Sequence, residues 1–390
     1  MLFNFGPKSS ILLIFFFHGI VFSFLLFKKG KQTDNSASKW LSLFVLLCTL
    51  YITPFMLGYA SWYSRKIYRE ILFFTPFQQV LLIGPVLFFY TQSLLNISFK
   101  LSKKQYIHFV PAFLYLIYSL IIFITDKWVL SEFYFYADGR DKDFDLWYQI
   151  AGLLSMVFYL VLSLRVYANY RKIVFETVSF ADSILFKWLK HFFIVFLCIL
   201  LLRVLFFILN PEWGEFGRKF WYYLSFSMLY YYIALSGYSN TIKASISIGD
   251  IPTDTQEPET IIVPLEDKVT ETILPDADLW KQKLLDLMLL EKLYKNPSLT
   301  VSDVATHLDT TPKLISSIVN SGFKMNFNDF INYYRVEAVK EQLKKGVQEN
   351  KTLLGIALEC GFNSKATFNR AFKKHTALSP KEFLVALHKS

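Results

Sequence analysis

The residues best suited to chemistry lie near the C-terminus, in the stretch LLGIALECGFNSKATFNRAF at 353–372. From Lys365 to Lys374 the chain carries four basic residues and no acidic one. If this segment is helical, at about 100° per residue, the side opposite Phe368 presents Ala366, Asn369, Arg370 and Lys373. Basic and amide groups on one helix face suit a DNA major groove. An ordinary amphipathic hairpin explains the same shape, so the rest of the chain must decide.

Two short helices joined by a turn are expected to position these residues. Apolar residues recur at helical spacing before Gly361, which breaks the pattern; they are Leu353, Ile356, Ala357 and Cys360. Asn363 and Ser364 are suited to cap the next helix, whose apolar side is Phe368, Ala371 and Phe372. This is the pattern of a helix-turn-helix.

A second copy of the pattern occupies residues 298–323, SLTVSDVATHLDTTPKLISSIVNSGF. Thr300 and Asp303 resemble a capping box, and Thr311-Pro312 is a typical helix start. Four polar residues then follow an i, i+3, i+4, i+7 stripe, which predicts a single outward face: Lys313, Ser316, Ser317 and Asn320.

Between the two hairpins, residues 327–343 keep a helical apolar stripe for about 18 residues, or about 27 Å. A helix of that length can hold two recognition helices about one DNA turn, or about 34 Å, apart. Two basic hairpins with such a spacer are a far more specific signal than either hairpin alone.

The chain contains three motifs in a fixed order: LTVSDVA, then FINYYRVEAVKEQL, then IALECGFNSKATFNRAFKKHTALSPKEF. With these motifs, residues 280–388 resemble the DNA-binding domain of AraC/XylS-type regulators. The resemblance implies a monomer with two helix-turn-helix units in successive major grooves, and it favours activation. The groove-facing residues it implies are Lys313, Ser316, Ser317, Asn320, Lys365, Ala366, Asn369, Arg370 and Lys373. Arg370, Asn369 and Lys365 are expected on base edges, and Lys373, Lys374 and Lys313 on phosphates.

One departure from that family is Ala377, where the family usually has glycine before the Ser-Pro pair. It is expected to strain the turn before the last helix slightly and to leave the readout face untouched. The usual sugar-binding partner domain is absent from the sequence, so no sugar ligand is carried over.

Charge divides the chain into three regimes. Residues 1–239 carry 22 Lys+Arg and 12 Asp+Glu, residues 240–279 carry 2 and 9, and residues 280–390 carry 17 and 10. We therefore expect three domains: 1–239 in the membrane, an acidic, Pro-containing linker at 240–275, and a DNA-binding domain at 276–390. The linker composition favours disorder or an extended chain. The three cysteines show neither disulfide nor metal spacing.

The first domain contains seven apolar runs of the length that a bilayer requires. They lie at roughly 9–27, 40–61, 71–95, 106–125, 146–169, 186–209 and 220–238. The predicted fold class is thus all-α: a seven-helix transmembrane bundle followed by a linker and two helix-turn-helix units joined by a long helix. Lysines follow the first run, which predicts a retained span with the N-terminus outside and the C-terminal domain in the cytoplasm.

Four polar residues within these runs are candidates for a ligand or an intramembrane role: Arg203, Gln78, Gln79 and His108. Snorkelling toward the outer interface is the favoured alternative for Arg203. Helix–helix hydrogen bonding explains the other three equally well.

The leading hypothesis is a transcription regulator of the inner (cytoplasmic) membrane that senses an unknown small-molecule or protein signal and binds double-stranded promoter DNA. A homodimer stays open. The alternative is a transporter or channel whose tail regulates its own gene. A membrane enzyme is the third class, but His18, His108 and His191 lack partner motifs, so we predict no catalytic residue, metal or cofactor.

Overall fold

The structure is a computed structural model that describes residues 3–96, 98–185, 187–209, 216–243 and 277–389. Among these residues the fold is all-helical, as predicted, apart from one isolated antiparallel bridge between Val178 and Thr300. Most of the expected linker at 240–275 lies outside the described residues.

The described residues divide into two compact units. The first contains residues 3–168 and the described residues from 187 to 243. The second combines the C-terminal region from residue 277 onward with a short piece of the N-terminal half, residues 169–185. The last turns of one apolar helix and the connection that follows it therefore belong to the same unit as the two hairpins.

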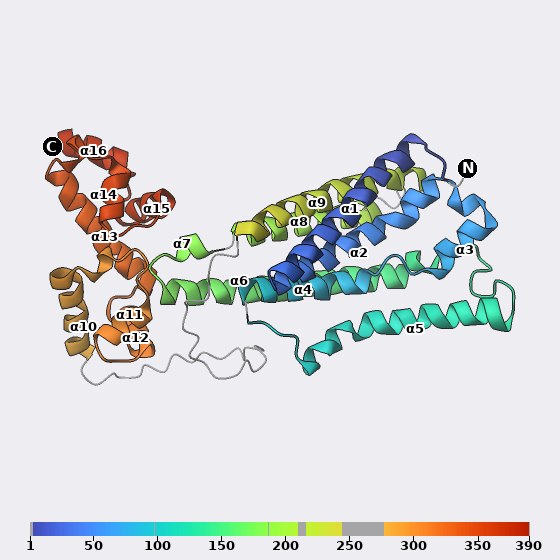
Figure 1. The fold of residues 1–390 in the computed structure, drawn as a ribbon, viewed down its shortest axis with the longest axis horizontal. Coiled ribbons are helices and arrows are strands. Elements are labelled where there is room, and N and C mark those ends of the chain that lie inside the picture. The colour runs from blue at the N-terminus through green and yellow to red at the C-terminus, as the bar shows by residue number, and fades with distance from the viewer. Residues whose placement is uncertain (1–2, 97, 186, 210–215, 244–276, 390) are drawn as a thin grey trace. The chain divides into compact units, whose positions relative to one another are not determined.

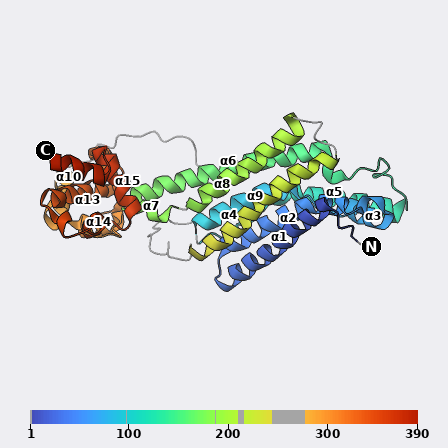
Figure 2. The same ribbon diagram turned by 90° about the horizontal axis from the view of Figure 1, so that it is seen from above.

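The first unit is built from long apolar helices, several of which lie side by side in both views (Figures 1 and 2). They are α1 (Pro7–Gln32), α2 (Ser36–Tyr59), α3 (Lys66–Phe74), α4 (Val80–Leu95), α5 (Val110–Ile124), α6 (Leu146–Thr177), α8 (Lys187–Val204) and α9 (Phe216–Lys243). A 3-10 helix at Lys103–Phe109 precedes α5, and π-helical turns at Thr125–Val129 and Leu205–Leu209 extend α5 and α8.

Five helices among the described residues are long and apolar enough to cross a membrane: Pro7–Gln32, Ser36–Tyr59, Lys103–Val129, Leu146–Thr177 and Lys187–Leu209. Helix α4 is apolar but has only 16 residues. Helix α9 covers the seventh predicted run, although its tyrosines and serines make it less apolar than these five. The predicted number of seven spans is therefore not confirmed.

The third predicted run, 71–95, is not one helix. Helix α3 ends at Phe74 and α4 begins at Val80, and Pro76 lies in the connection between them. Proline lacks the N–H that a continuous helix needs and disfavours a helical conformation in the residue before it. The connection at residues 75–79, TPFQQ, is mostly polar, so the sequence carries a local signal of this break that the predicted run of 71–95 did not use.

The second unit contains the two predicted hairpins and the helix between them (Figure 1). Its helices are α7 (Ala181–Ile184), α10 (Ala277–Asp286), α11 (Val301–His307), α12 (Pro312–Gly322), α13 (Phe327–Lys344), α14 (Leu353–Glu359), α15 (Lys365–Thr376) and α16 (Pro380–Lys389). A π-helical turn at Leu287–Glu291 continues α10.

Helix α13 supplies apolar residues to two separate hydrophobic clusters. Phe327, Phe330 and Ile331 at its N-terminal end pack with α10, α11 and α12. Its later residues, Val336, Val339 and Leu343, pack with α14 and α15. Because α13 belongs to both cores, it fixes the two hairpins relative to each other within this unit.

Candidate nucleic-acid interface

The first hairpin, α11 and α12, begins each helix with a threonine cap. The Thr300 hydroxyl accepts from the N–H of Asp303 at 3.2 Å while the Asp303 carboxylate accepts from the N–H of Thr300 at 2.7 Å, which confirms the capping box. Thr311 caps α12 by accepting from the N–H of Leu314 at 3.3 Å. These caps satisfy helix N–H groups that have no partner within the helix.

The second hairpin, α14 and α15, uses the same local chemistry. The Thr352 hydroxyl accepts from the N–H of Gly355 at 3.0 Å, and the Ser364 hydroxyl accepts from the N–H of Thr367 at 3.2 Å. Of the two predicted caps, Ser364 therefore fills the position, while the Asn363 side chain is directed to another segment.

The outward faces of α12 and α15 lie where the sequence predicts them. In α12, Lys313 and Asn320 are exposed and Ser316 and Ser317 are half-buried, while Ile315, Ile318 and Val319 are buried. In α15 the exposed residues are Lys365, Ala366, Asn369, Arg370, Lys373 and Lys374. Thr367, Phe368, Ala371 and Phe372 form the buried side of α15.

The turns of the two hairpins differ in how tightly they pack. In the first, Asp309 has a φ of +50° and its side chain is exposed. In the second, Gly361 has a φ of +96°, and a Cβ there would run into the carbonyl oxygen of Tyr294 and lie 2.9 Å from Cα of Lys295. Only glycine fits this second turn, because both its backbone conformation and the close approach exclude a side chain.

The end of α15 carries the departure noted in the sequence. Ala377 caps the helix in the left-handed region with a φ of +63°, a conformation that favours glycine. The expectation of a slightly strained turn at this residue agrees with that backbone. Ala377 lies outside the outward face of α15.

The connection between α6 and α8 packs into the second unit. Val178 forms the bridge to Thr300, and the N–H of Ser179 donates to the carbonyl of Leu299 at 3.0 Å. The side chain of Asn328, on α13, donates to the carbonyl of Val178 at 3.3 Å. Val178 and Ser179 are both buried, so this connection is part of the interior of the unit.

The guanidinium of Arg335 is the buried centre of these contacts. It donates to Ser179 through the carbonyl at 3.2 Å and the hydroxyl at 2.9 Å. It also donates to the carbonyls of Tyr294 at 2.8 Å and Asn296 at 2.7 Å, and to the side-chain oxygen of Asn332 at 3.3 Å. Burial lowers the pKa of Arg335 to about 9, so the group remains charged at neutral pH. Several oxygen acceptors compensate this charge for its lost hydration.

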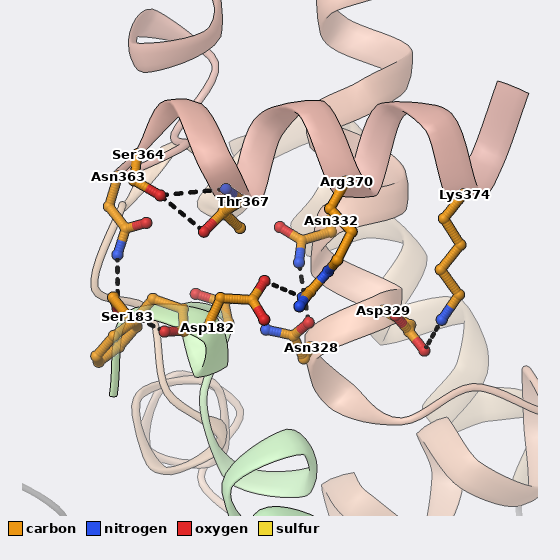
Figure 3. A network of polar contacts seen from close by, with 12 residues as sticks. Asp182, Ser183, Asn328, Asp329, Asn332, Asn363, Ser364, Thr367, Arg370 and Lys374 are labelled. Atoms are coloured by element: carbon orange, nitrogen blue, oxygen red, sulfur yellow. Dashed lines mark hydrogen bonds and ion pairs between the residues drawn. The ribbon is translucent and has the colours of Figure 1, made fainter. Parts of the chain in front are cut away.

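The same connection also reaches the outward face of α15 (Figure 3). The carboxylate of Asp182 forms an ion pair with the guanidinium of Arg370, and the side-chain amide of Asn363 donates to the Ser183 hydroxyl at 3.2 Å. The Asp182 side chain is 11% exposed and that of Arg370 is 53% exposed. Arg370 also lies over the ring of Phe175, 5.9 Å from its centroid. Partial burial, and then the charge of Arg171, lower the pKa of Arg370.

Lys374 is the second basic residue of α15 that forms an ion pair. Its ammonium group pairs with the carboxylate of Asp329, on α13, at 2.5 Å. The predicted phosphate contact of Lys374 therefore requires this ion pair to open. The ion pair lies within the second unit and joins α15 to the start of α13 (Figure 3).

The candidate intramembrane residues lie in the first unit and fall into separate groups. Arg203 is 4% exposed and donates to the Gln149 carbonyl at 2.9 Å and to its side-chain oxygen at 2.5 Å. Gln149 in turn donates to the side chain of Gln78 at 2.9 Å, so Arg203 and Gln78 share one network. Such burial does not fit the snorkelling interpretation of Arg203.

The other two candidates make local contacts. Gln79 donates to the carbonyl of Pro76 at 2.7 Å, and His108 contacts the Tyr159 hydroxyl at 2.8 Å through Nδ1. Neither shares a hydrogen bond with Arg203 or Gln78 among the contacts of the described residues.

Sequence reasoning missed Arg335, Ser179 and Asp182. Arg335 lies on a helix whose stripe is otherwise apolar, but arginine is usually exposed, and nothing in its spacing indicates burial. A useful signal existed for Asp182, which is the single acid between Thr177 and Leu185, in the segment between two predicted spans.

Comparison with known proteins agrees with this geometry. A family model described as a helix-turn-helix domain matches residues 304–385. An uncharacterised HTH-type transcriptional regulator of Staphylococcus aureus is 28% identical over 92 residues, which cover 24% of this chain and 12% of that protein. The melibiose operon regulatory protein of Escherichia coli is 28% identical over 86 residues, which cover 22% of this chain and 28% of that protein. No solved structure matches the chain significantly.

Residues 304–385 therefore form a helix-turn-helix domain, and the resemblance to AraC/XylS-type domains is confirmed for this part of the chain. The chain spans about an eighth to a quarter of the length of the curated relatives it matches. The residues that the family model matches lie in the second unit.

Proposed function

We propose that this chain is a membrane-embedded, sequence-specific transcription regulator. The apolar helices hold it in the cytoplasmic membrane with the N-terminus outside, and the C-terminal double helix-turn-helix binds promoter DNA in the cytoplasm. The membrane helices respond to a small-molecule or protein signal, and a homodimer is compatible with this arrangement.

The observation that carries the DNA-binding part is the outward face of α15 inside a helix-turn-helix domain. Lys365, Asn369 and Arg370 are exposed on this face, and their side chains supply the donors that base edges in a major groove accept. Lys313 and Lys373 are exposed and suited to phosphates, which fix the register of a protein on the duplex.

The spacing of the two hairpins supports simultaneous binding. Helix α13 has 18 residues, which correspond to about 27 Å. Its packing in both hydrophobic clusters holds α12 and α15 in one arrangement, as recognition of successive grooves requires.

The membrane part of the proposal is supported by the five helices that are long and apolar enough to span. In such a segment an ionised side chain is expected to have a polar partner. The burial of Arg203 against Gln149 fits that expectation.

A first experiment is genome-wide crosslinking of the full-length protein to DNA, with membrane fractionation of the same cells. Discrete promoter peaks from membrane-retained protein are the expected result, and the strongest peak supplies a DNA probe. Intact membrane protein that gives no peaks under varied growth conditions would contradict the proposal and favour a transporter with a silent tail.

The readout is then tested with full-length protein in lipid nanodiscs and that probe. Arg370→Ala is expected to weaken specific binding by about 1–3 kcal/mol and to relax the preference at one base pair, because it removes a bidentate donor. Lys283→Ala, a charge-matched control on α10, is expected to retain that preference. An unchanged affinity of Arg370→Ala for the probe would refute the assignment of Arg370.

A further inference from the structure

The connection between α6 and α8 makes two kinds of contact with the second unit. Val178 and Ser179 are buried against α13 and the start of the first hairpin, where Arg335 holds Ser179. Asp182 and Ser183, a few residues later, lie instead against the outward side of α15. The first contact anchors the segment, while the second engages Arg370, which is proposed to meet DNA.

We propose that residues 181–184, which form α7, are an internal inhibitor of the second helix-turn-helix: Asp182 holds Arg370 away from DNA until the segment moves. This inference rests on the proposed function. It assigns the surface between α7 and α15 to control of DNA binding.

The dimensions of the major groove argue that this contact and DNA binding exclude each other. The groove is about 12 Å wide and a helix with its side chains is about 10–12 Å in diameter. A recognition helix therefore fills the groove, and a second segment that contacts its base-reading arginine has no space there.

The charge of Asp182 also argues that its contact with Arg370 and DNA binding exclude each other. Asp182 places a carboxylate beside Arg370, where bound DNA would bring bases and phosphates. If the carboxylate stayed in place, it would repel the phosphates and compete for the same guanidinium. The ion pair is therefore compatible with the state without DNA.

The contact is also of a strength that a signal can overcome. Arg370 is about half exposed, and ion pairs at such positions are weak. The anchor at Ser179 and Arg335 is buried and need not break when α7 moves. Asp182 follows directly from α6, because only four residues separate it from Thr177, the last residue of that helix. A movement of α6 is thus passed through a short stretch of chain to Asp182, which pairs with Arg370.

The first test measures binding of the promoter probe by full-length protein in nanodiscs. Asp182→Asn removes the charge but keeps the size of the side chain, and it is expected to raise the affinity roughly two- to fivefold. Glu349→Gln makes the same charge change at an exposed site between α13 and α14, and is expected to leave the affinity unchanged. Equal or lower affinity for Asp182→Asn would overturn the proposal.

A second test locks the contact. Ser183→Cys with Asn363→Cys replaces two side chains that lie 3.2 Å apart, and Cys198→Ser removes the exposed native thiol. Disulfide formation is expected to reduce affinity for the probe at least tenfold, and reduction is expected to restore it. Full affinity in the oxidised, crosslinked protein would refute the inhibitor while leaving the proposed function intact. Loss of binding in both states, together with failure of the unmodified protein to bind, would instead refute the proposed function.

Discussion

The two hairpins share one local design but differ in their surroundings. Both recognition helices begin with a hydroxyl cap and bury their apolar side against α13. The outward face of α12 carries one lysine, whereas α15 carries Lys365, Arg370, Lys373 and Lys374. Two of those four basic groups are held in ion pairs, Arg370 by Asp182 and Lys374 by Asp329.

This difference in charge and in ion pairing suggests different roles for the two helix-turn-helix motifs. The first hairpin presents polar groups suited to constant contact with a duplex. The second combines most of the positive charge with partners that neutralise part of it. Under the proposed function we therefore expect control of DNA binding to act at the second hairpin, where opening an ion pair frees a basic group of α15.

The largest expected effect concerns the turns. Gly361→Ala should destabilise the second unit by about 2–5 kcal/mol, because a left-handed alanine is strained and its Cβ meets the backbone at Tyr294. Hydrogen exchange of buried amides in α13 and α14 of the full-length protein measures the change in opening free energy.

The matched control is Asp309→Ala in the turn of the first hairpin, where the side chain is exposed. It should cost no more than about 1–2 kcal/mol, since only the backbone conformation is affected. An equal loss of opening free energy in the two variants would show that the close packing of the second turn does not distinguish the hairpins.

A smaller effect is expected in the salt dependence of DNA binding. Each phosphate contact contributes about 0.9 to the slope of log affinity against log salt concentration. Lys313→Ala should lower this slope by about one, and the double variant Lys373→Ala, Lys374→Ala by about two, because both of these α15 lysines are assigned to phosphates once the ion pair of Lys374 with Asp329 opens. Titrations with the promoter probe at several salt concentrations measure both. A larger change of slope for Lys313→Ala than for the double variant would contradict the assignment of most phosphate contacts to α15.

The smallest effect concerns the ends of the recognition helices. The C-cap of α12 is Phe323, with an ordinary φ of −107°, whereas the C-cap of α15 is Ala377, with a φ of +63°. Ala377→Gly should therefore stabilise α15 by about 1 kcal/mol, seen as slower hydrogen exchange in its last turn. Ala366→Gly, in the first turn of α15, should have the opposite sign. Faster exchange in Ala377→Gly would contradict the strain at this cap.

The sequence was sufficient where the signal is local. The caps at Thr300 and Ser364, the helix at 327–344 and the outward faces of α12 and α15 all follow from spacing within a few residues. These features depend on periodicity and on hydrogen bonds between near neighbours, which a single sequence contains.

The features that the sequence analysis missed depend on contacts between distant residues, or on a short break inside a long apolar run. The ion pair of Asp182 with Arg370 and the bonds of Arg335 to Ser179 join segments that are far apart in the chain. The end of α3 at Phe74 was missed because the short, mostly polar connection at 75–79, TPFQQ, lies between two apolar segments that were counted as one run. The burial of Arg203 depends on Gln149, on a different helix.

The contacts of Arg335 have a consequence for the order in which the chain is made. Ser179 and Arg335 are 156 residues apart, so a ribosome completes Ser179 long before its partner exists. At the rates typical of synthesis, about 5–20 residues per second, that interval is on the order of ten seconds or more. Ser179 lacks this partner during that time, and the second unit acquires its full set of buried hydrogen bonds only after α13 has been translated. Its assembly is then a late event that follows the synthesis of α6 and α8.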